Sequence, residues 1–370
     1  MQKRSITLLS FTVFWLIVSI IPISCYAQNY ERSYNLGRNG DTVTLNLSIT
    51  PSLYEYYQEK PHISTPDRFG SFVTPYALAQ VAEDIRSIFN APEDYVNGVL
   101  MLVHQIPYQI VNESRYPVET IIENRGDCDL FSYIAASLLK AQSLDVVLFY
   151  YQQESHMNIG VSLSTPPNDA RTAISYVDHE GTRYYMAECT GGNPENGWRV
   201  GECPPELQGA HVTVIELDNS EQTAPGQVYS SFDALVPSSI TLSTATRFVI
   251  EGSSVTLRGQ VSIPNPSGNV TLFLAIRDDW SVLDSSSISP DGTFQFSWSP
   301  IVWGQTLMRA SWAGDGLYAG AESATVSVFV IPKVAILAGI GIIVLVALYA
   351  IVAMKTRNHH DTALESYSYM

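Results

Sequence analysis

The chain passes from loop to helix at Asn124-Arg125-Gly126-Asp127-Cys128-Asp129-Leu130-Phe131-Ser132, which places a cysteine directly after a Gly-Asp turn. Apolar residues then recur at helical spacing (Leu130, Ile134, Leu138 and Ala141), and the Asp127 side chain suits an N-cap. Cys128 therefore falls in the first turn of a predicted helix, where unpaired backbone N–H groups and the helix dipole favour a thiolate. We expect a nucleophilic cysteine here; the alternative is a buried structural thiol.

A cysteine nucleophile needs a base for its proton and a third group that orients the base. His156 begins the predicted strand 156–163 and points away from the apolar face of that strand. Glu188 lies just before a turn in the predicted strand 182–190. Antiparallel pairing of these strands would bring Glu188 beside His156. Asp178 is the alternative orienting carboxylate, although its neighbours read as a solvated hairpin tip.

The other histidines are weaker candidates for a catalytic base or a metal ligand. His104, His179 and His211 lack a comparable placement, and none shows close ligand spacing such as His-x-x-x-His. We therefore expect no metal site from them. The chemistry predicted for Cys128 requires no cofactor.

These segments resemble the transglutaminase-like superfamily over residues 76–192. The resemblance lies in Gly126-Asp127-Cys128, in Leu138-Leu139-Lys140-Ala141, in a histidine that opens a strand, and in Ala187-Glu188-Cys189-Thr190, where the family usually has Asp-Pro-Thr or Asp-Ala-Thr. Tyr108 matches an aromatic residue that often precedes the cysteine helix. The resemblance implies a papain-like fold with Cys128 as nucleophile, His156 as base and Glu188 as acid. Glu in place of Asp is one departure, and Asn158 in place of an aromatic residue is another.

Periodicity predicts helices first and an antiparallel sheet afterwards in this part of the chain. The expected helices cover 76–89, 92–104 and 130–141, and the expected strands cover 145–151, 156–163 and 182–190. Residues 28–217 are thus expected to form one α+β domain with an N-terminal β extension. Residues 218–235, rich in polar and turn-forming residues, are the expected linker.

Short strands separated by turns occupy residues 236–331, which is typical of a β-sandwich. The segments Glu251-Gly252-Ser253, Asp291-Gly292-Thr293-Phe294 and Ala310-Ser311-Trp312-Ala313-Gly314-Asp315 resemble the Ig-like modules of prokaryotic surface proteins. Trp298 and Trp312 are expected in its core. The predicted fold class is therefore an α+β papain-like/transglutaminase-like domain, followed by an all-β Ig-like sandwich and a C-terminal transmembrane helix.

Both ends of the chain carry apolar runs. Residues 1–27 are typical of a signal peptide, with an uncleaved N-terminal anchor as the alternative. Residues 332–354 are expected to form a transmembrane helix, and Lys355 and Arg357 assign residues 355–370 to a cytoplasmic tail. Residues 28–331 would then be extracellular, on a protein that crosses the cell membrane once, or twice if the N-terminal segment is uncleaved.

Charge and cysteine count narrow the function further. The formal net charge of -16 argues against nucleic-acid binding, which needs clustered Lys and Arg. If Cys25 leaves with the signal, three cysteines remain. A disulfide between Cys189 and Cys203 would close a short loop and leave Cys128 unpaired.

The sequence thus predicts a membrane-anchored extracellular cysteine enzyme that transfers an acyl group from a peptide or amide bond. Water as acceptor would make it a protease or amidase, and an amine would make it a cross-linking enzyme. The alternative is a transglutaminase-like module that has lost activity and serves binding or adhesion at the cell surface. Its expected partners are an extracellular protein or peptide substrate, the membrane through the C-terminal helix, and a surface partner of the Ig-like domain.

Overall fold

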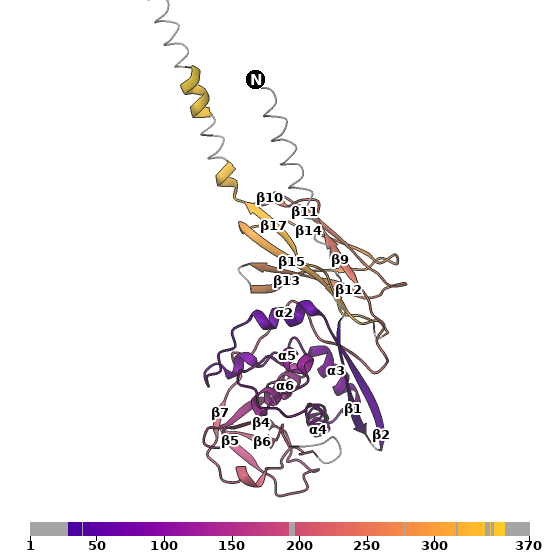
Figure 1. Ribbon diagram of the computed structural model, residues 1–370, viewed down its shortest axis with the longest axis vertical. Helices are drawn as coiled ribbons and strands as arrows, with labels where there is room; N and C mark the ends of the chain where they lie inside the picture. Colours follow the sequence, from indigo (N-terminus) through magenta and orange to yellow (C-terminus); the bar gives the residue numbers. More distant parts are fainter. Residues whose placement is uncertain are drawn as a thin grey trace, which may run out of the picture.

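The computed structural model describes residues 29–38, 40–191, 197–276, 279–315, 317–336, 341 and 344–351. The predicted signal segment 1–27 and the predicted tail 355–370 lie outside these residues. Figure 1 shows an N-terminal unit of helices and strands at one end and an all-β unit at the other.

The N-terminal unit contains five α-helices and two sheets among its described residues. The helices are α2 (Pro51–Glu59), α3 (Ala79–Ile88), α4 (Pro92–Val103), α5 (Pro117–Glu123) and α6 (Cys128–Ala141). One sheet has the order β1-β2-β8 (Tyr30–Arg38, Asp41–Ile49 and Tyr229–Ser231). The other has the order β5-β6-β4-β3-β7 (Tyr176–His179, Thr182–Ala187, His156–Ser162, Val146–Tyr151 and Thr213–Ile215).

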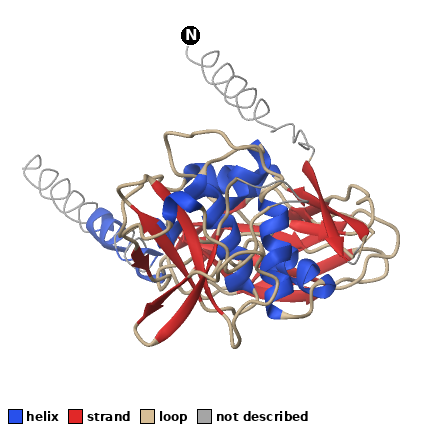
Figure 2. Cartoon of the chain, turned by 90° about the horizontal axis from the view of Figure 1, so that it is seen from below, coloured by secondary structure: helices blue, strands red, loops and turns tan. Residues whose placement is uncertain are grey.

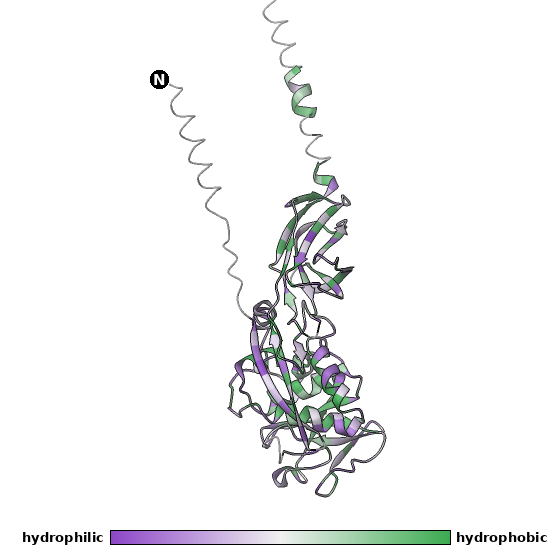
Figure 3. Ribbon diagram, turned by 90° about the vertical axis from the view of Figure 1, so that its right-hand side faces the viewer, coloured by the Kyte–Doolittle hydropathy of each residue, from purple (hydrophilic) through white to green (hydrophobic). Residues whose placement is uncertain are grey.

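Helices α3 to α6 lie between these two sheets, and α2 packs against α5. On one side α3, α4 and α5 pack against β1 or β8, and on the other side α6 packs against β3 and β4 (Figure 1; Figure 2 gives the same elements from below). One hydrophobic core contains residues of both sheets and of all five helices. The hydropathy colouring in Figure 3 shows this helical layer as largely hydrophobic. The three layers bury apolar side chains on two faces, which stabilises the unit.

Helix α6 is the central element. Ten consecutive residues, Leu130–Leu139, are buried, so α6 is enclosed on every side rather than along one stripe. The helix ends at Ala141, and the following turn contains Ser143 with a φ of 60°. Because only the ends of α6 reach the surface, its first residue, Cys128, is half-buried.

The C-terminal unit is a sandwich of two sheets. One sheet has the order β14-β11-β9 (Thr293–Trp298, Val255–Val261 and Ile240–Ser243). The other has the order β10-β17-β15-β12-β13 (Phe248–Ile250, Val326–Ile331, Gly304–Trp312, Asn269–Ile276 and Asp279–Ser287), with β16 (Ala321–Glu322) paired to β15. Alternate residues of both sheets share one core. Trp298 and Trp312 are buried there, as predicted.

Polar contacts join the two units. Residues 218–235, the expected linker, contain β8, and the Tyr229 hydroxyl lies 2.9 Å from the Ser311 Oγ of the sandwich. The side chain of Glu322 is fully buried; it accepts a hydrogen bond from Ser52 of α2 and lies 3.4 Å from Arg309 Nη1. A buried carboxylate needs such partners to remain stable.

The predicted fold class is corrected by this architecture. The described chain is mostly β, with seventeen strands in four sheets, and no clear papain-like α+β core stands apart from them. The physical reason is the hairpin of β1 and β2. The sequence predicts only an N-terminal β extension here, yet the hairpin joins β8 to form a full sheet that covers one face of the helices.

The predicted membrane anchor is also corrected. None of the helices within the described part of the chain is long and apolar enough to span a bilayer. Within the predicted span, residues 333–336, 341 and 344–351 are described and helical. Residues 337–340, 342–343 and 352–354 of the predicted span lie outside the described residues. The single-pass or two-pass localisation and the membrane as a partner therefore lose their support.

Candidate active site

The predicted helix start at Cys128 is confirmed, but the cap differs from the expectation. Asp127 occupies the N-cap position without a side-chain capping bond. Its Oδ2 instead accepts a hydrogen bond from the Val111 N–H at 2.8 Å, which ties the preceding loop to the start of α6. As the first helical residue, Cys128 has a backbone N–H with no acceptor inside the helix.

The Cys128 thiol contacts the strand that carries the predicted base. Its Sγ lies 3.9 Å from the carbonyl oxygen of Ser155, and the thiol is close enough to the next residue, His156, to raise the pKa of that ring. Ser155 adopts a φ of 50°, a left-handed conformation that costs a non-glycine residue energy. This turn directs the Ser155 carbonyl and the His156 ring toward the same sulfur.

His156 and Glu188 come together as predicted. His156 Nε2 lies 3.0 Å from Glu188 Oε2, and Glu188 is fully buried. Antiparallel pairing of β4 with β6 brings the two segments side by side. Because Nε2 binds the carboxylate, Nδ1 is the ring nitrogen left for the thiol.

Glu188 has a hydrogen-bond donor at each of its acceptor positions. Oε1 accepts from the Thr190 backbone N–H at 2.8 Å and from the Thr190 hydroxyl at 2.6 Å. Oε2 accepts from the Asn158 side-chain amide at 3.0 Å as well as from His156. Burial alone would raise the pKa of Glu188, but the hydrogen bonds and the charge of His156 outweigh burial and lower it. The carboxylate is therefore ionised at neutral pH.

The protonation of His156 follows from the same contacts. Burial tends to lower the pKa of the ring, but hydrogen bonds to Cys128 and Glu188, together with their negative charges, raise it to about 10. At neutral pH the ring is therefore an imidazolium, which can neutralise a thiolate on one side while it binds a carboxylate on the other.

Two further carboxyl groups, those of Asp127 and Asp129, flank Cys128 in sequence. Burial, a hydrogen bond to Asp127 and the negative charge of Asp127 raise the pKa of Asp129 to about 7. Asp127 Oδ1 is buried and has no other partner among the described residues. Asp129 Oδ2 also accepts a bond from the Ser114 hydroxyl at 3.1 Å. Below about pH 7, a proton on Asp129 therefore removes one negative charge next to Cys128.

Three supporting residues were missed at the sequence level. Buried His104 lies with Nε2 3.0 Å from the backbone carbonyl oxygen of Glu188 and so holds the main chain at that point. Asn158 and Thr190 hold its carboxylate, as described above. His104 is 84 residues from Glu188, and no local pattern reveals such a contact. Asn158 had been noted only as a departure from the family pattern.

The alternative orienting group does not reach the site. Asp178 is exposed on the hairpin of β5 and β6, where its two oxygens bind Arg183 at 2.8 Å and 3.0 Å. The other two cysteines in the described chain, Cys189 and Cys203, are buried free thiols, so no disulfide joins them. Burial raises the pKa of Cys189 well above its usual range. Cys128 is thus the accessible thiol of the three.

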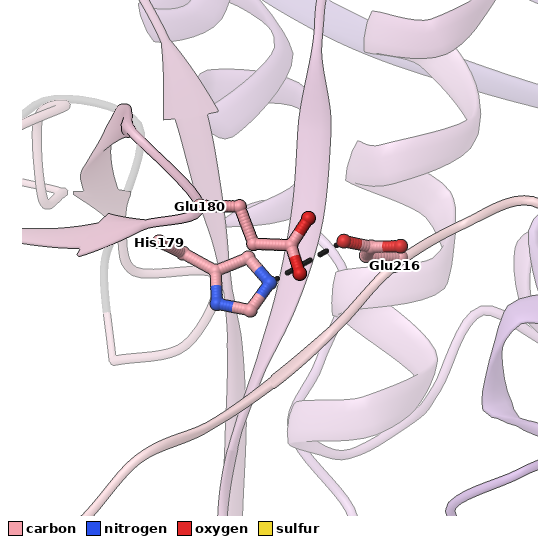
Figure 4. A group of neighbouring side chains, drawn as sticks. All are labelled: His179, Glu180 and Glu216. Carbon is pink, nitrogen blue, oxygen red and sulfur yellow. Dashed lines mark hydrogen bonds and ion pairs between the residues drawn. The ribbon is translucent and has the colours of Figure 1, made fainter.

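One group of side chains could meet a metal ion. His179, Glu180 and Glu216 bring one ligand atom each within 4.8 Å of one another at the tip of the β5–β6 hairpin and just after β7 (Figure 4). His179 Nε2 lies 3.3 Å from Glu216 Oε1. Because two of the three groups are exposed carboxylates, which often gather on surfaces without a metal, we assign no ion here.

Comparisons with known proteins give no family. No family model matches the chain, and no curated protein matches it. Among solved structures, the CARDB domain of a Pyrococcus furiosus protein in complex with di-metal ions is 16% identical, covers 26% of this chain and 94% of that domain, and has a TM-score of 0.19. The sulfur carrier protein SoxY from Chlorobium limicola is 14% identical, covers 26% of this chain and 80% of its own, and has a TM-score of 0.20.

A chain from a structure that addresses T cell specificity and activation by the bacterial superantigen toxic shock syndrome toxin-1 is likewise 14% identical. The match covers 25% of this chain and 98% of that one, with a TM-score of 0.20. All three TM-scores are far below 0.5, so these likenesses support no inference about this chain. None of these three structures is named as transglutaminase-like. The resemblance of the sequence to that superfamily stays a prediction.

Proposed function

We propose that this protein is a cysteine-dependent acyl-transfer enzyme that acts on an amide or related carbonyl group. The observation that carries the proposal is the linked set of Cys128, His156 and Glu188. The thiol lies close enough to the imidazole to raise its pKa, and the imidazole binds a carboxylate that is buried and fully hydrogen-bonded. Burial of an ionised carboxylate is unfavourable unless it has hydrogen-bond donors and a charged partner. Within the described residues, the charged partner of Glu188 is His156, the base beside the thiol.

The proposed reaction proceeds in two steps. Cys128 Sγ attacks the substrate carbonyl carbon, and the carbonyl electron pair moves to its oxygen, where the Cys128 backbone N–H stabilises the oxyanion. When the oxyanion collapses, the C–N bond breaks and His156 gives its proton to the leaving amine. A thioester on Cys128 remains.

The second step releases the acyl group. Water or a primary amine attacks the thioester carbonyl, and His156 accepts the proton of the nucleophile. Collapse of this second intermediate breaks the C–S bond and returns the thiolate and the imidazolium. Glu188 stays ionised throughout and keeps the ring in the orientation that serves both steps.

The reactivity of the thiol provides the first test. The full chain is treated with iodoacetamide at pH 6, and modification of Cys128 is followed by mass spectrometry of peptides. We expect wild-type Cys128 to react at least about ten times faster than in His156→Ala, because the imidazolium is lost. His211→Ala, at an exposed histidine, is the matched control and should react like the wild type. Equal rates in wild type and His156→Ala would contradict the proposal.

Turnover provides the second test. p-Nitrophenyl acetate is offered as an acyl donor, with and without cadaverine as a primary amine. We expect an acetyl group to appear transiently on Cys128 and to pass to water or to cadaverine, and Cys128→Ser to lose nearly all of this activity. An inactive binding module would show no acetyl transfer in either protein.

A further inference from the structure

The loop before α6 forms a short extended edge beside Cys128. Tyr108 and Gly126 pair as a parallel bridge, in which the Gly126 N–H donates to the Pro107 carbonyl at 3.3 Å. The Gln109 N–H donates to the Gly126 carbonyl at 2.7 Å. Two residues further on, the Val111 N–H donates to the Asp127 side chain at 2.8 Å. One edge of residues 107–111 is therefore fixed against the start of α6.

The opposite edge of this segment is open. In an extended chain, the main-chain groups of alternate residues point to opposite sides, so those of Tyr108 and Ile110 point away from Gly126. No hydrogen bond within the described part of the chain uses the backbone N–H or carbonyl of either residue. Both side chains are also exposed, Tyr108 by 57% and Ile110 by 75%. Exposed strand edges with apolar side chains invite pairing with another chain.

This open edge lies next to the reactive sulfur. The Tyr108 ring meets the Phe131 ring edge-on with a centroid distance of 6.2 Å. Phe131 lies three residues after Cys128, so both project from the same face of α6. Burial and the negative charges of Cys128 and its neighbours raise the pKa of the Tyr108 hydroxyl, which is consistent with this proximity.

We propose that the edge of residues 107–111 binds the substrate as an extended peptide strand. The peptide backbone would pair with the free main-chain groups of Tyr108 and Ile110, which leads its reacting carbonyl to Cys128. The exposed side chains of these two residues would contact apolar side chains of the peptide. Strand addition of this kind derives affinity from backbone hydrogen bonds and specificity from alternate side chains. The inference rests on the proposed function and names its substrate class.

Peptide aldehydes test this inference, because they form a reversible adduct with a reactive thiol. The probes are acetyl-Leu-Leu-Leu-alaninal, the same peptide aldehyde methylated on its three leucine N–H groups, and acetyl-alaninal. Each is measured by how strongly it protects Cys128 of the full chain from iodoacetamide. We expect the long aldehyde to protect at concentrations about tenfold or more below those of the short one, since two or three backbone bonds each contribute about 1 kcal/mol. Methylation should remove most of that advantage.

Two variants at Ile110 test whether the edge of residues 107–111 causes the preference for the long aldehyde. Ile110→Pro removes an outward N–H, while Ile110→Ala keeps it and removes only the side chain. We expect the preference for the long over the short aldehyde to fall about fivefold or more in Ile110→Pro and less in Ile110→Ala. Unfolding in urea, compared with the wild type, shows that each variant is folded. If both variants are folded, a difference between them in preference for the long aldehyde cannot come from a general loss of stability.

The outcomes separate this inference from the proposed function. If both aldehydes protect Cys128 equally in the wild type, or if methylation has no effect, strand addition is wrong while the reactive thiol stands. If neither aldehyde protects and iodoacetamide reacts slowly, the proposed function itself is wrong.

Discussion

The imidazole of His156 and the carboxylate of Glu188 meet at 3.0 Å between two strands that pair antiparallel. The two residues are 32 positions apart in sequence, and the carboxylate has no exposure to solvent. The ring therefore has a fixed partner on one nitrogen, which leaves the other for the Cys128 sulfur.

Removing the charge of Glu188 should weaken the base. In Glu188→Gln a hydrogen bond to His156 can remain, but the negative charge that helps to raise the pKa of His156 is gone. We expect the pKa of the ring to fall by at least about one unit, and alkylation of Cys128 at pH 6 to slow about tenfold. The pH profile of iodoacetamide labelling measures this. Asp178→Asn, at an exposed carboxylate bound to Arg183, is the control and should leave the profile unchanged.

The Thr190 hydroxyl should protect the protein against acid. It donates to Glu188 at 2.6 Å and so helps to lower the pKa of that carboxyl. A lowered carboxyl pKa adds stability above the unfolded value, near 4.5, and this stability is lost as the pH falls through the lower folded value. In Thr190→Val we expect acid unfolding to begin at higher pH, with Thr190→Ser close to the wild type. Circular dichroism during acid titration reports the midpoint, and identical midpoints for all three proteins would refute the role.

Asp129 should make stability depend on pH in the opposite direction. Its pKa is raised from 3.8 to about 7, so the folded state holds a proton that the unfolded state releases at lower pH. Stability should therefore fall as the pH rises from about 4 to above 7. Relative to Asp129→Asn, we expect the wild type to lose on the order of 1 kcal/mol of unfolding free energy between pH 5 and pH 8. Urea unfolding at both pH values measures the difference. The exposed Asp67→Asn serves as the control, and matching slopes in wild type and Asp129→Asn would count against a raised pKa of Asp129.

The ion pair between the two units should be strongly coupled. The side chain of Glu322 is fully buried, and Arg309 lies 3.4 Å away with most of its side chain buried too. Arg309→Met leaves a buried carboxylate without its cation, at a cost of about 3–5 kcal/mol in unfolding free energy. Adding Glu322→Gln should recover much of that loss because no charge is then buried. A double-mutant cycle by urea unfolding gives the coupling, and an additive pair would exclude it.

Local patterns predicted the elements that carry the candidate site. The periodicity of Leu130–Ala141 and the alternation after His156 gave α6 and β4 close to their observed bounds, and Glu188 follows directly after β6. These signals lie within single segments, so no tertiary information was needed. The antiparallel pairing of β4 and β6 was expected from the Pro-, Asn- and Gly-containing connection between them, and it is observed.

The parts of the fold and of the site that local patterns did not predict depend on contacts between distant segments. The sheet of β1, β2 and β8 needs residues about 180 positions apart, which no local pattern reveals. Asp127 suited an N-cap, yet the backbone of Val111 competes for its carboxylate in the folded chain. Helix α5 is short, and β13 is largely polar and exposed, so neither gave a clear periodic signal. His104 likewise ends a helix with no indication of its partner.

The hydrogen bonding of Glu188 limits how this position can be redesigned. An ionised carboxylate offers about four lone pairs, and Thr190, Asn158 and His156 already use four of them. Aspartate would retract the oxygens by one methylene, so it could follow either the threonine or the histidine, but not both. A shorter acid here would therefore require the turn after β6 to be rebuilt as well.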